Sequence, residues 1–288
     1  MRARDRRHSV ARRRLIASVL AVGAVGLLLW AATGLINLLG TNTHGAEVTE
    51  TSIESKAVPG EHPVSVVVPD GAGEGERGML VFLHGRSGDD GSYTNDEEFF
   101  QALADQGDEA PIVVFPDGGD SSYWHDRASG DWGSFVTDEV IPQMAEEFGA
   151  DPDRVAVGGI SMGGFGALDL AMKNPGMFCA VGGHSPALFL SGGESAPGAF
   201  DDAEDFAEND VLATAAADPD AFSSQQVFLD AGRRDPFVPG VTELAGSLEA
   251  AGADAIAELD WPGGHDEDYW NAHWDEYLAF YANSLADC

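Results

Sequence analysis

The chain has 288 residues, with 49 acidic residues against 15 Lys and Arg, a formal net charge of −34 and a pI near 4.2. A surface this acidic repels phosphate backbones, which excludes nucleic acid as a partner. Hydrophobic residues make up 44% of the chain, an ordinary share for a folded protein, so we do not expect wholesale disorder despite the charge.

The N-terminus has the pattern of a membrane-targeting segment. Residues 1–14 form a basic tail with seven Arg and one acid, and residues 15–40 contain no charged side chain. A helix of that length can cross a bilayer of about 30 Å, with the Arg tail kept in the cytoplasm. We therefore expect a single-pass transmembrane signal-anchor at the cell membrane, with the remainder extracytoplasmic. A cleaved signal peptide, which would make the protein secreted, is the alternative.

The polar stretch 41–59 is predicted to be a linker between membrane and domain. From residue 60 onward, short apolar runs alternate with helical patterns, and continuous apolar runs are typical of strands buried on both faces. We predict one α/β domain over residues 60–288, with a mostly parallel sheet and helices on both faces. The predicted strands are Val64–Val68, Met79–Leu83, Ile112–Phe115, Arg154–Ile160, Phe178–Gly183, Val227–Leu229 and Ala255–Leu259.

Helical spacing of apolar residues lies between these strands. Residues 185–224 are rich in Gly, Pro, Asp and Ala and break the alternation, so we expect an excursion over the sheet edge. Two cysteines do not amount to a disulfide framework, and Cys179, in an apolar run, is predicted to be a small buried residue. The predicted helices are Asp96–Gln106, Gly133–Phe148, Met162–Asn174, Val241–Ala251 and Asp268–Leu285.

The segment 159–163 reads Gly-Ile-Ser-Met-Gly, a G-x-S-x-G match centred on Ser161. A buried-strand pattern precedes it and a helix pattern follows it, which is the context of a nucleophile elbow. The small residues around Ser161 allow the helix to approach the strand, and the helix N-terminus favours developing negative charge. An ordinary serine in a glycine-rich turn is the alternative interpretation.

A serine nucleophile needs a base, and the base needs an orienting carboxylate, in the chain order Ser, acid, His. Asp235 lies past the end of a predicted strand and is our first choice for the acid, with Asp230 second. His265 lies in a glycine-containing loop after the last strand and is the predicted base. Other histidines fit less well: His125 and His184 lie where they could contact substrate or line the site.

The oxyanion of an acyl-transfer reaction needs two hydrogen-bond donors. The backbone N–H of Met162, directly after the nucleophile, is one candidate. The second is expected from the loop after an earlier strand, where the N–H of Arg86 is our choice. The side chain of Arg86 would then be free to hold a substrate carboxylate or to pair with Asp89 or Asp90.

Four stretches together resemble the putative-esterase family of the α/β-hydrolase superfamily, which includes esterase D, feruloyl-type esterases and secreted mycolyltransferases. The resemblance runs from about residue 64 to residue 285 and implies an α/β-hydrolase fold. It implies Ser161 as nucleophile, Asp235 as acid and His265 as base, with the amides of Arg86 and Met162 forming the oxyanion hole. The four stretches are Leu83-His84-Gly85-Arg86, the segment 159–164, Gly232-Arg233-Arg234-Asp235, and Gly263-Gly264-His265-Asp266 with Tyr269-Trp270.

We expect a serine esterase that hydrolyses a small-molecule, carbohydrate or lipid ester through an acyl-enzyme, with no metal or organic cofactor required. Candidate substrate-binding residues are His84, Tyr123, Trp124 and Trp270. The segment 121–132, with Tyr123, Trp124 and Trp132, suits a sugar or aromatic platform, or its aromatic residues pack within the loop. An acyltransferase that moves the acyl group to a sugar hydroxyl is the first alternative. A non-catalytic cell-surface binding module is an alternative of another class.

Overall fold

The computed structural model describes residues 40–71 and 77–288 of the chain. Residues 43–288 form one compact unit, which carries all the predicted site residues. The predicted basic tail 1–14 and, except for Gly40, the predicted anchor 15–40 lie outside the described residues. Within the described ranges, no helix is long and apolar enough to span a bilayer.

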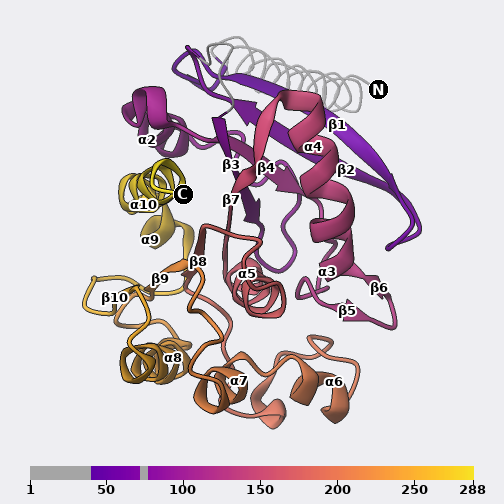
Figure 1. Ribbon diagram of the computed structural model, residues 1–288, viewed down its shortest axis with the longest axis vertical. Helices are drawn as coiled ribbons and strands as arrows, with labels where there is room; N and C mark the ends of the chain where they lie inside the picture. The colour runs from indigo at the N-terminus through magenta and orange to yellow at the C-terminus, as the bar shows by residue number, and fades with distance from the viewer. Residues whose placement is uncertain (1–39, 72–76) are drawn as a thin grey trace, which may run out of the picture. The chain divides into compact units, whose positions relative to one another are not determined.

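An eight-stranded sheet forms the centre of the described unit (Figure 1), in the order β1-β2-β4-β3-β7-β8-β9-β10. β1 and β2 run antiparallel to each other, β2 runs antiparallel to β4, and all the neighbouring pairs from β4 to β10 are parallel. The strand bounds are Glu47–Ser55 (β1), Gly60–Val68 (β2), Arg77–Leu83 (β3), Ile112–Pro116 (β4), Ala150–Ile160 (β7), Ala180–His184 (β8), Gln226–Asp230 (β9) and Ala255–Glu258 (β10).

All seven predicted strands are present, and the predicted, mostly parallel sheet is confirmed. The linker predicted over 41–59 is wrong, because β1 occupies most of it and pairs with β2 from Glu47↔Val68 to Ser55↔Gly60. β1 is an edge strand with mostly polar, partly exposed side chains. It therefore lacks the continuous apolar run by which the central strands are recognised.

Helices cover both faces of the sheet, as predicted. Strand β3 shows why: Met79, Val81 and Leu83 point into one apolar core, while Leu80 and Phe82 point into the other. Figure 1 shows α2 and α10 on one side of the central strands and α4 on the other. The helix bounds are Glu97–Asp105 (α2), Trp132–Ser134 (α3), Ile141–Phe148 (α4), Met162–Lys173 (α5), Val238–Ala251 (α8), Glu267–Asn271 (α9) and Trp274–Ala286 (α10), with a π-helical turn at Phe135–Val140.

The excursion over 185–224 contains the short helices α6 (Ala203–Glu208) and α7 (Val211–Ala217). Arg127 fastens it to the rest of the fold. Its guanidinium forms an ion pair with Asp201 and donates to the carbonyl oxygens of Gly198 and Ala199, at 2.9 Å each. A buried arginine side chain with all these acceptors holds the excursion in one position.

Cys179 and Cys288 form a disulfide and Cys179 is half-buried, so the prediction of Cys179 as a small buried residue is wrong. Their Cα atoms lie 5.9 Å apart, although the residues are separated by 109 positions. Arg154 of β7 donates to the Leu285 carbonyl at 2.8 Å and so holds the end of α10 beside the start of β8. The pairing depends on this non-local docking of the C-terminus, which cysteine counting does not reveal.

Candidate active site

Ser161 occupies a sharp turn between β7 and α5. Its backbone has φ 58° and ψ −112°, a conformation that costs free energy for a residue with a Cβ. The turn depends on glycine: a Cβ on Gly163 would lie 1.9 Å from the Leu83 carbonyl oxygen. A Cβ on Gly159 would lie 2.5 Å from the backbone of Gly163. This strained turn is the geometry of a nucleophile elbow, and it presents the Ser161 hydroxyl above the sheet.

His265 links Ser161 to Asp235 by two hydrogen bonds. The Ser161 hydroxyl lies 2.8 Å from Nε2 of His265, and Nδ1 lies 2.9 Å from Oδ2 of Asp235. The three residues follow β7, β9 and β10, which are parallel, so their carboxyl ends meet at the same edge of the sheet. With Nδ1–H donating to the carboxylate, Nε2 is left to accept the serine proton.

The loops that carry Asp235 and His265 are joined by backbone hydrogen bonds. The amides of Arg233 and Arg234 donate to the carbonyl oxygens of Trp261 and Gly263, at 3.0 Å each. Asp235 is buried, and its second oxygen accepts the amide of Phe237 at 2.8 Å. The carboxylate therefore has little freedom to turn away from the imidazole.

Asp230, the second candidate acid, lies elsewhere. It is buried at the end of β9, where Oδ1 lies 2.6 Å from Nδ1 of His184. His184 is buried too and does not line the cavity beside Ser161. His125 is buried and pairs with Asp205 of α6, which also removes it from the site.

A cavity of about 930 Å³ opens beside Ser161 and His265. Tyr123, Phe237 and Trp270 give it an aromatic side. The exposed carboxylates of Glu97, Glu98 and Glu267, in the first turns of α2 and α9, give it an acidic rim. Arg86 is the one Arg or Lys among the lining residues that the structure describes.

The two predicted oxyanion donors follow β3 and β7, which are neighbouring parallel strands. Met162 is the first residue of α5, and the first N–H groups of a helix have no acceptor within the helix. Arg86 lines the cavity in the loop after β3. Its side chain is exposed and donates to the Pro197 carbonyl at 3.3 Å, and no ion pair joins it to Asp89 or Asp90.

The four predicted substrate contacts divide into two pairs. Tyr123 and Trp270 line the cavity, and the Trp270 ring meets His265 edge-on at 5.1 Å between centroids. Burial raises the pKa of the Tyr123 hydroxyl, which the nearby Arg86 charge partly offsets. The phenol is therefore a neutral donor at ordinary pH.

His84 and Trp124 are fully buried, so their prediction as substrate contacts is wrong. The two nitrogens of His84 bond the Gly118 amide at 2.9 Å and the Gly85 carbonyl at 2.7 Å. The Trp124 indole donates to the His84 carbonyl at 3.2 Å. Both residues therefore stabilise the backbone next to Arg86, and neither of them lines the cavity.

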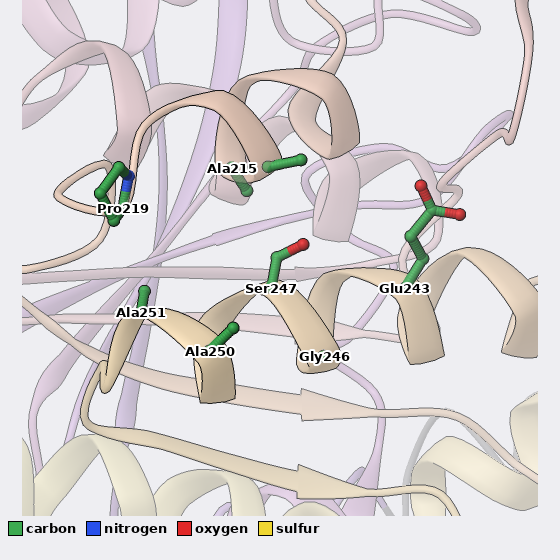
Figure 2. Close-up of a pocket in the computed structure, with 8 residues that line it drawn as sticks. Ala215, Pro219, Glu243, Gly246, Ser247, Ala250 and Ala251 are labelled. Atoms are coloured by element: carbon green, nitrogen blue, oxygen red, sulfur yellow. The ribbon is translucent and has the colours of Figure 1, made fainter.

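Phe237 and Glu267 line the cavity but were not predicted. They lie two residues after Asp235 and His265, respectively, and that proximity was the available signal. A separate groove of about 420 Å³ lies between α7 and α8 and includes none of Ser161, Asp235 and His265. Figure 2 shows that its labelled side chains are small except for Glu243.

A model of the family described as "Putative esterase" matches residues 55–281. The chain belongs to this esterase family. Among curated proteins, the chain is 29% identical to Esterase Rv1288 of Mycobacterium tuberculosis over 160 residues, which are 52% of this chain and 34% of that protein. It is 28% identical to an acetyl esterase of Caldicellulosiruptor saccharolyticus over 181 residues, 56% of this chain and 68% of that one. The chain thus spans about a third of the length of the mycobacterial esterase.

Solved structures share the fold of this esterase family member. A ferulic acid esterase superposes with a TM-score of 0.74 at 22% identity, covering 83% of this chain and 99% of that one. An S-formylglutathione hydrolase from Agrobacterium tumefaciens gives 0.69 at 20% identity, covering 84% and 96%. These likenesses show that the chain has an α/β-hydrolase-like fold.

Proposed function

We propose that the protein is a serine esterase that cleaves carboxylic esters through the Ser161–His265–Asp235 triad. The observation that carries this proposal is the unbroken hydrogen-bonded line from the serine hydroxyl through the imidazole to the buried carboxylate, at 2.8 and 2.9 Å. Ser161, at one end of this series of hydrogen bonds, lines a cavity large enough for a small ester. Family membership supports the same chemistry.

In the first half of the reaction, Ser161 Oγ attacks the ester carbonyl carbon while its proton passes to Nε2 of His265. Asp235 holds the imidazole and stabilises its positive form. The oxyanion is bound by the amides of Met162 and Arg86. The imidazolium returns the proton to the departing alcohol, which leaves an acyl-enzyme on Ser161. A water molecule, deprotonated by His265, then releases the acid and restores the serine.

The lining of the cavity favours an uncharged ester. The aromatic side can bury an acyl or aromatic group, while the carboxylates of Glu97, Glu98 and Glu267 repel anions at the entrance. Proteins similar to this chain include an acetyl esterase and a ferulic acid esterase, whose names indicate a short acyl group and an aromatic acid. We include both classes in the proposal.

Replacement of Ser161 tests the proposal directly. Ser161→Ala should fold normally, lose hydrolysis of p-nitrophenyl acetate and lose covalent labelling by a fluorophosphonate probe, because the attacking oxygen is gone. Ser247→Ala, on α8 and remote from the cavity, is the matched control and should keep both. Retained hydrolysis in Ser161→Ala, or a wild type that the probe does not label, would contradict the assignment. The latter result favours a non-catalytic binding module.

An extracytoplasmic, membrane-anchored location is also proposed. It is supported by the uncharged stretch 15–40 after an Arg-rich tail and by the Cys179–Cys288 disulfide, since disulfides persist in oxidising compartments. Protein alkylated directly in lysed native cells, without reductant, should therefore carry no free thiol. Two reactive thiols in that protein would place the domain in a reducing compartment.

A further inference from the structure

Five buried polar side chains lie beneath the triad and are not part of it. The Asp230 carboxylate at the end of β9 lies at their centre: Oδ1 pairs with Nδ1 of His184 at 2.6 Å. Oδ2 accepts the hydroxyls of Tyr269 at 2.7 Å and Tyr277 at 2.9 Å. The hydroxyl of Tyr281 lies 2.8 Å from Nε2 of His184. These five residues, each no more than 2% exposed, are named the Asp230 cluster.

Two glycines of the central strands leave space for the Asp230 cluster. A Cβ on Gly158 or on Gly182 would lie 1.9 Å from the Tyr281 hydroxyl, so two adjacent central strands leave out side chains where the phenol enters. Burial, reinforced by the Asp230 charge, raises the pKa of all three tyrosines, which therefore remain protonated donors. Apolar side chains would fill the same space more simply, so the polar groups call for a functional explanation.

One branch of the Asp230 cluster reaches the nucleophile. The amide of Ser161 donates to the backbone carbonyl of His184 at 3.0 Å. The amide of the next residue, Ser185, donates to the carbonyl of Asp230 at 2.8 Å. The elbow is thus tied through the ends of β8 and β9 to the residues at the centre of the cluster.

The other branch reaches the base. Tyr269 lies four positions after His265, and its ring lies against the backbone of Gly263, where a Cβ would be only 2.3 Å from Tyr269 Cδ2. The Gly263 carbonyl accepts the amide of Arg234, which directly precedes Asp235. The hydrogen bond from Tyr269 to Asp230 therefore fixes the position of the Tyr269 ring. This ring contacts Gly263 in the His265 loop, and Gly263 is hydrogen-bonded to the loop that carries Asp235.

We propose that Tyr269 is a positioning residue: its hydrogen bond to Asp230 sets the His265 loop relative to the Ser161 elbow. This inference rests on the proposed esterase function. Tyr277 donates to the same carboxylate oxygen from α10, but the three atoms nearest to a Cβ built on Gly263 all belong to Tyr269. The hydroxyls of Tyr269 and Tyr277 donate to the same oxygen of Asp230, but only Tyr269 has the positioning role. The two residues therefore offer a matched comparison.

The experiment compares Tyr269→Phe with Tyr277→Phe, which each delete one hydroxyl and keep the ring. Both should lower the melting temperature by similar amounts, because each leaves Asp230 one donor short. Tyr269→Phe should lower kcat for p-nitrophenyl acetate about tenfold with KM within about twofold, since small misplacements of reacting groups slow chemistry more than binding. Tyr277→Phe should keep kcat within about twofold of the wild-type value, because its ring does not support the His265 loop.

A second readout does not depend on activity. The downfield proton resonance of the His265–Asp235 hydrogen bond, assigned by its loss in His265→Gln, should move or broaden in Tyr269→Phe and stay unchanged in Tyr277→Phe. The corresponding His184–Asp230 resonance should change in both variants and serves as the internal control. A wild type that hydrolyses no ester, combined with this pattern, would refute the function and leave the positioning role intact.

Two results would overturn the inference. An unchanged kcat and an unchanged His265 resonance in Tyr269→Phe would show that the hydroxyl does not position the base. Equal losses of kcat in the two variants would show that Asp230 acts only through general stability. If Tyr269→Phe does not fold, Gly263→Ala perturbs the same contact from the other side, and unchanged kcat there has the same meaning.

Discussion

Asp235 and Asp230 are close together in the chain, on one strand and the loop after it, yet their surroundings assign them different roles. Asp230 is still within β9, so its carboxylate is buried beneath the sheet edge among histidine and tyrosine side chains. Asp235 lies past the strand, where the loop turns it toward His265. The carboxylate of Asp235, in the loop after the strand, is therefore the one that contacts the imidazole of His265.

Replacement of Asp235 by Asn should lower kcat by about 10³- to 10⁴-fold with a small effect on folding. The amide can donate to Nδ1, which favours the imidazole tautomer that cannot accept the serine proton. Steady-state kinetics with p-nitrophenyl acetate checks this, with the exposed Asp260→Asn as the matched control. A loss of about tenfold or less would mean that the carboxylate does not orient the base.

At this scale the sequence predicted that Ser161, Asp235 and His265 meet, because motif, chain order and strand ends all constrain them. It did not predict which aromatic residues face the cavity. Trp124 is buried because Gly118 of its own loop and Gly166 of α5 leave room for its side chain: a Cβ on either would lie 2.4 Å from a carbon of the Trp124 side chain. The space left by Gly166, on a helix far along the chain, has no signature within the loop that carries the tryptophan.

At the scale of elements, α5 combines the elbow with a buried charge. Asp169 is 0% exposed; Oδ2 accepts from Lys173 at 2.9 Å, and Oδ1 has no partner among the described residues. Burial raises the pKa of Asp169 to about 6, an effect that Lys173 only partly offsets. Because the folded-state pKa exceeds the unfolded one, protonation favours the fold, and this contribution is lost as pH rises from about 4 to about 6.

Asp169→Asn removes this titration. From about pH 5 to about pH 7.5, the free energy of unfolding of the wild type should fall by about 1 kcal/mol relative to the variant, because the folded-state pKa lies above the unfolded one. Urea unfolding of both proteins at the two pH values measures the difference. A difference that stays constant with pH would mean that the carboxyl does not titrate in that window.

For the whole molecule, the disulfide is the dominant covalent constraint. It closes a loop of 109 positions, and cross-links over loops of that length restrict the unfolded chain strongly. Cys288→Ser should therefore lower the free energy of unfolding by about 3 kcal/mol and the melting temperature by about 10 °C. The wild type treated with reductant should match the variant, and reductant should leave the variant unchanged; equal melting temperatures without reductant would contradict the prediction.

The same bond determines what a protease cut would do. Asp235 and His265 both lie inside the closed loop, whereas Ser161 lies before it. A single protease cut in the excursion over 185–224 would leave two polypeptides that stay covalently attached through the Cys179–Cys288 disulfide. The nicked protein would migrate as one band until reduced, and Ser161 would remain in the same molecule as Asp235 and His265.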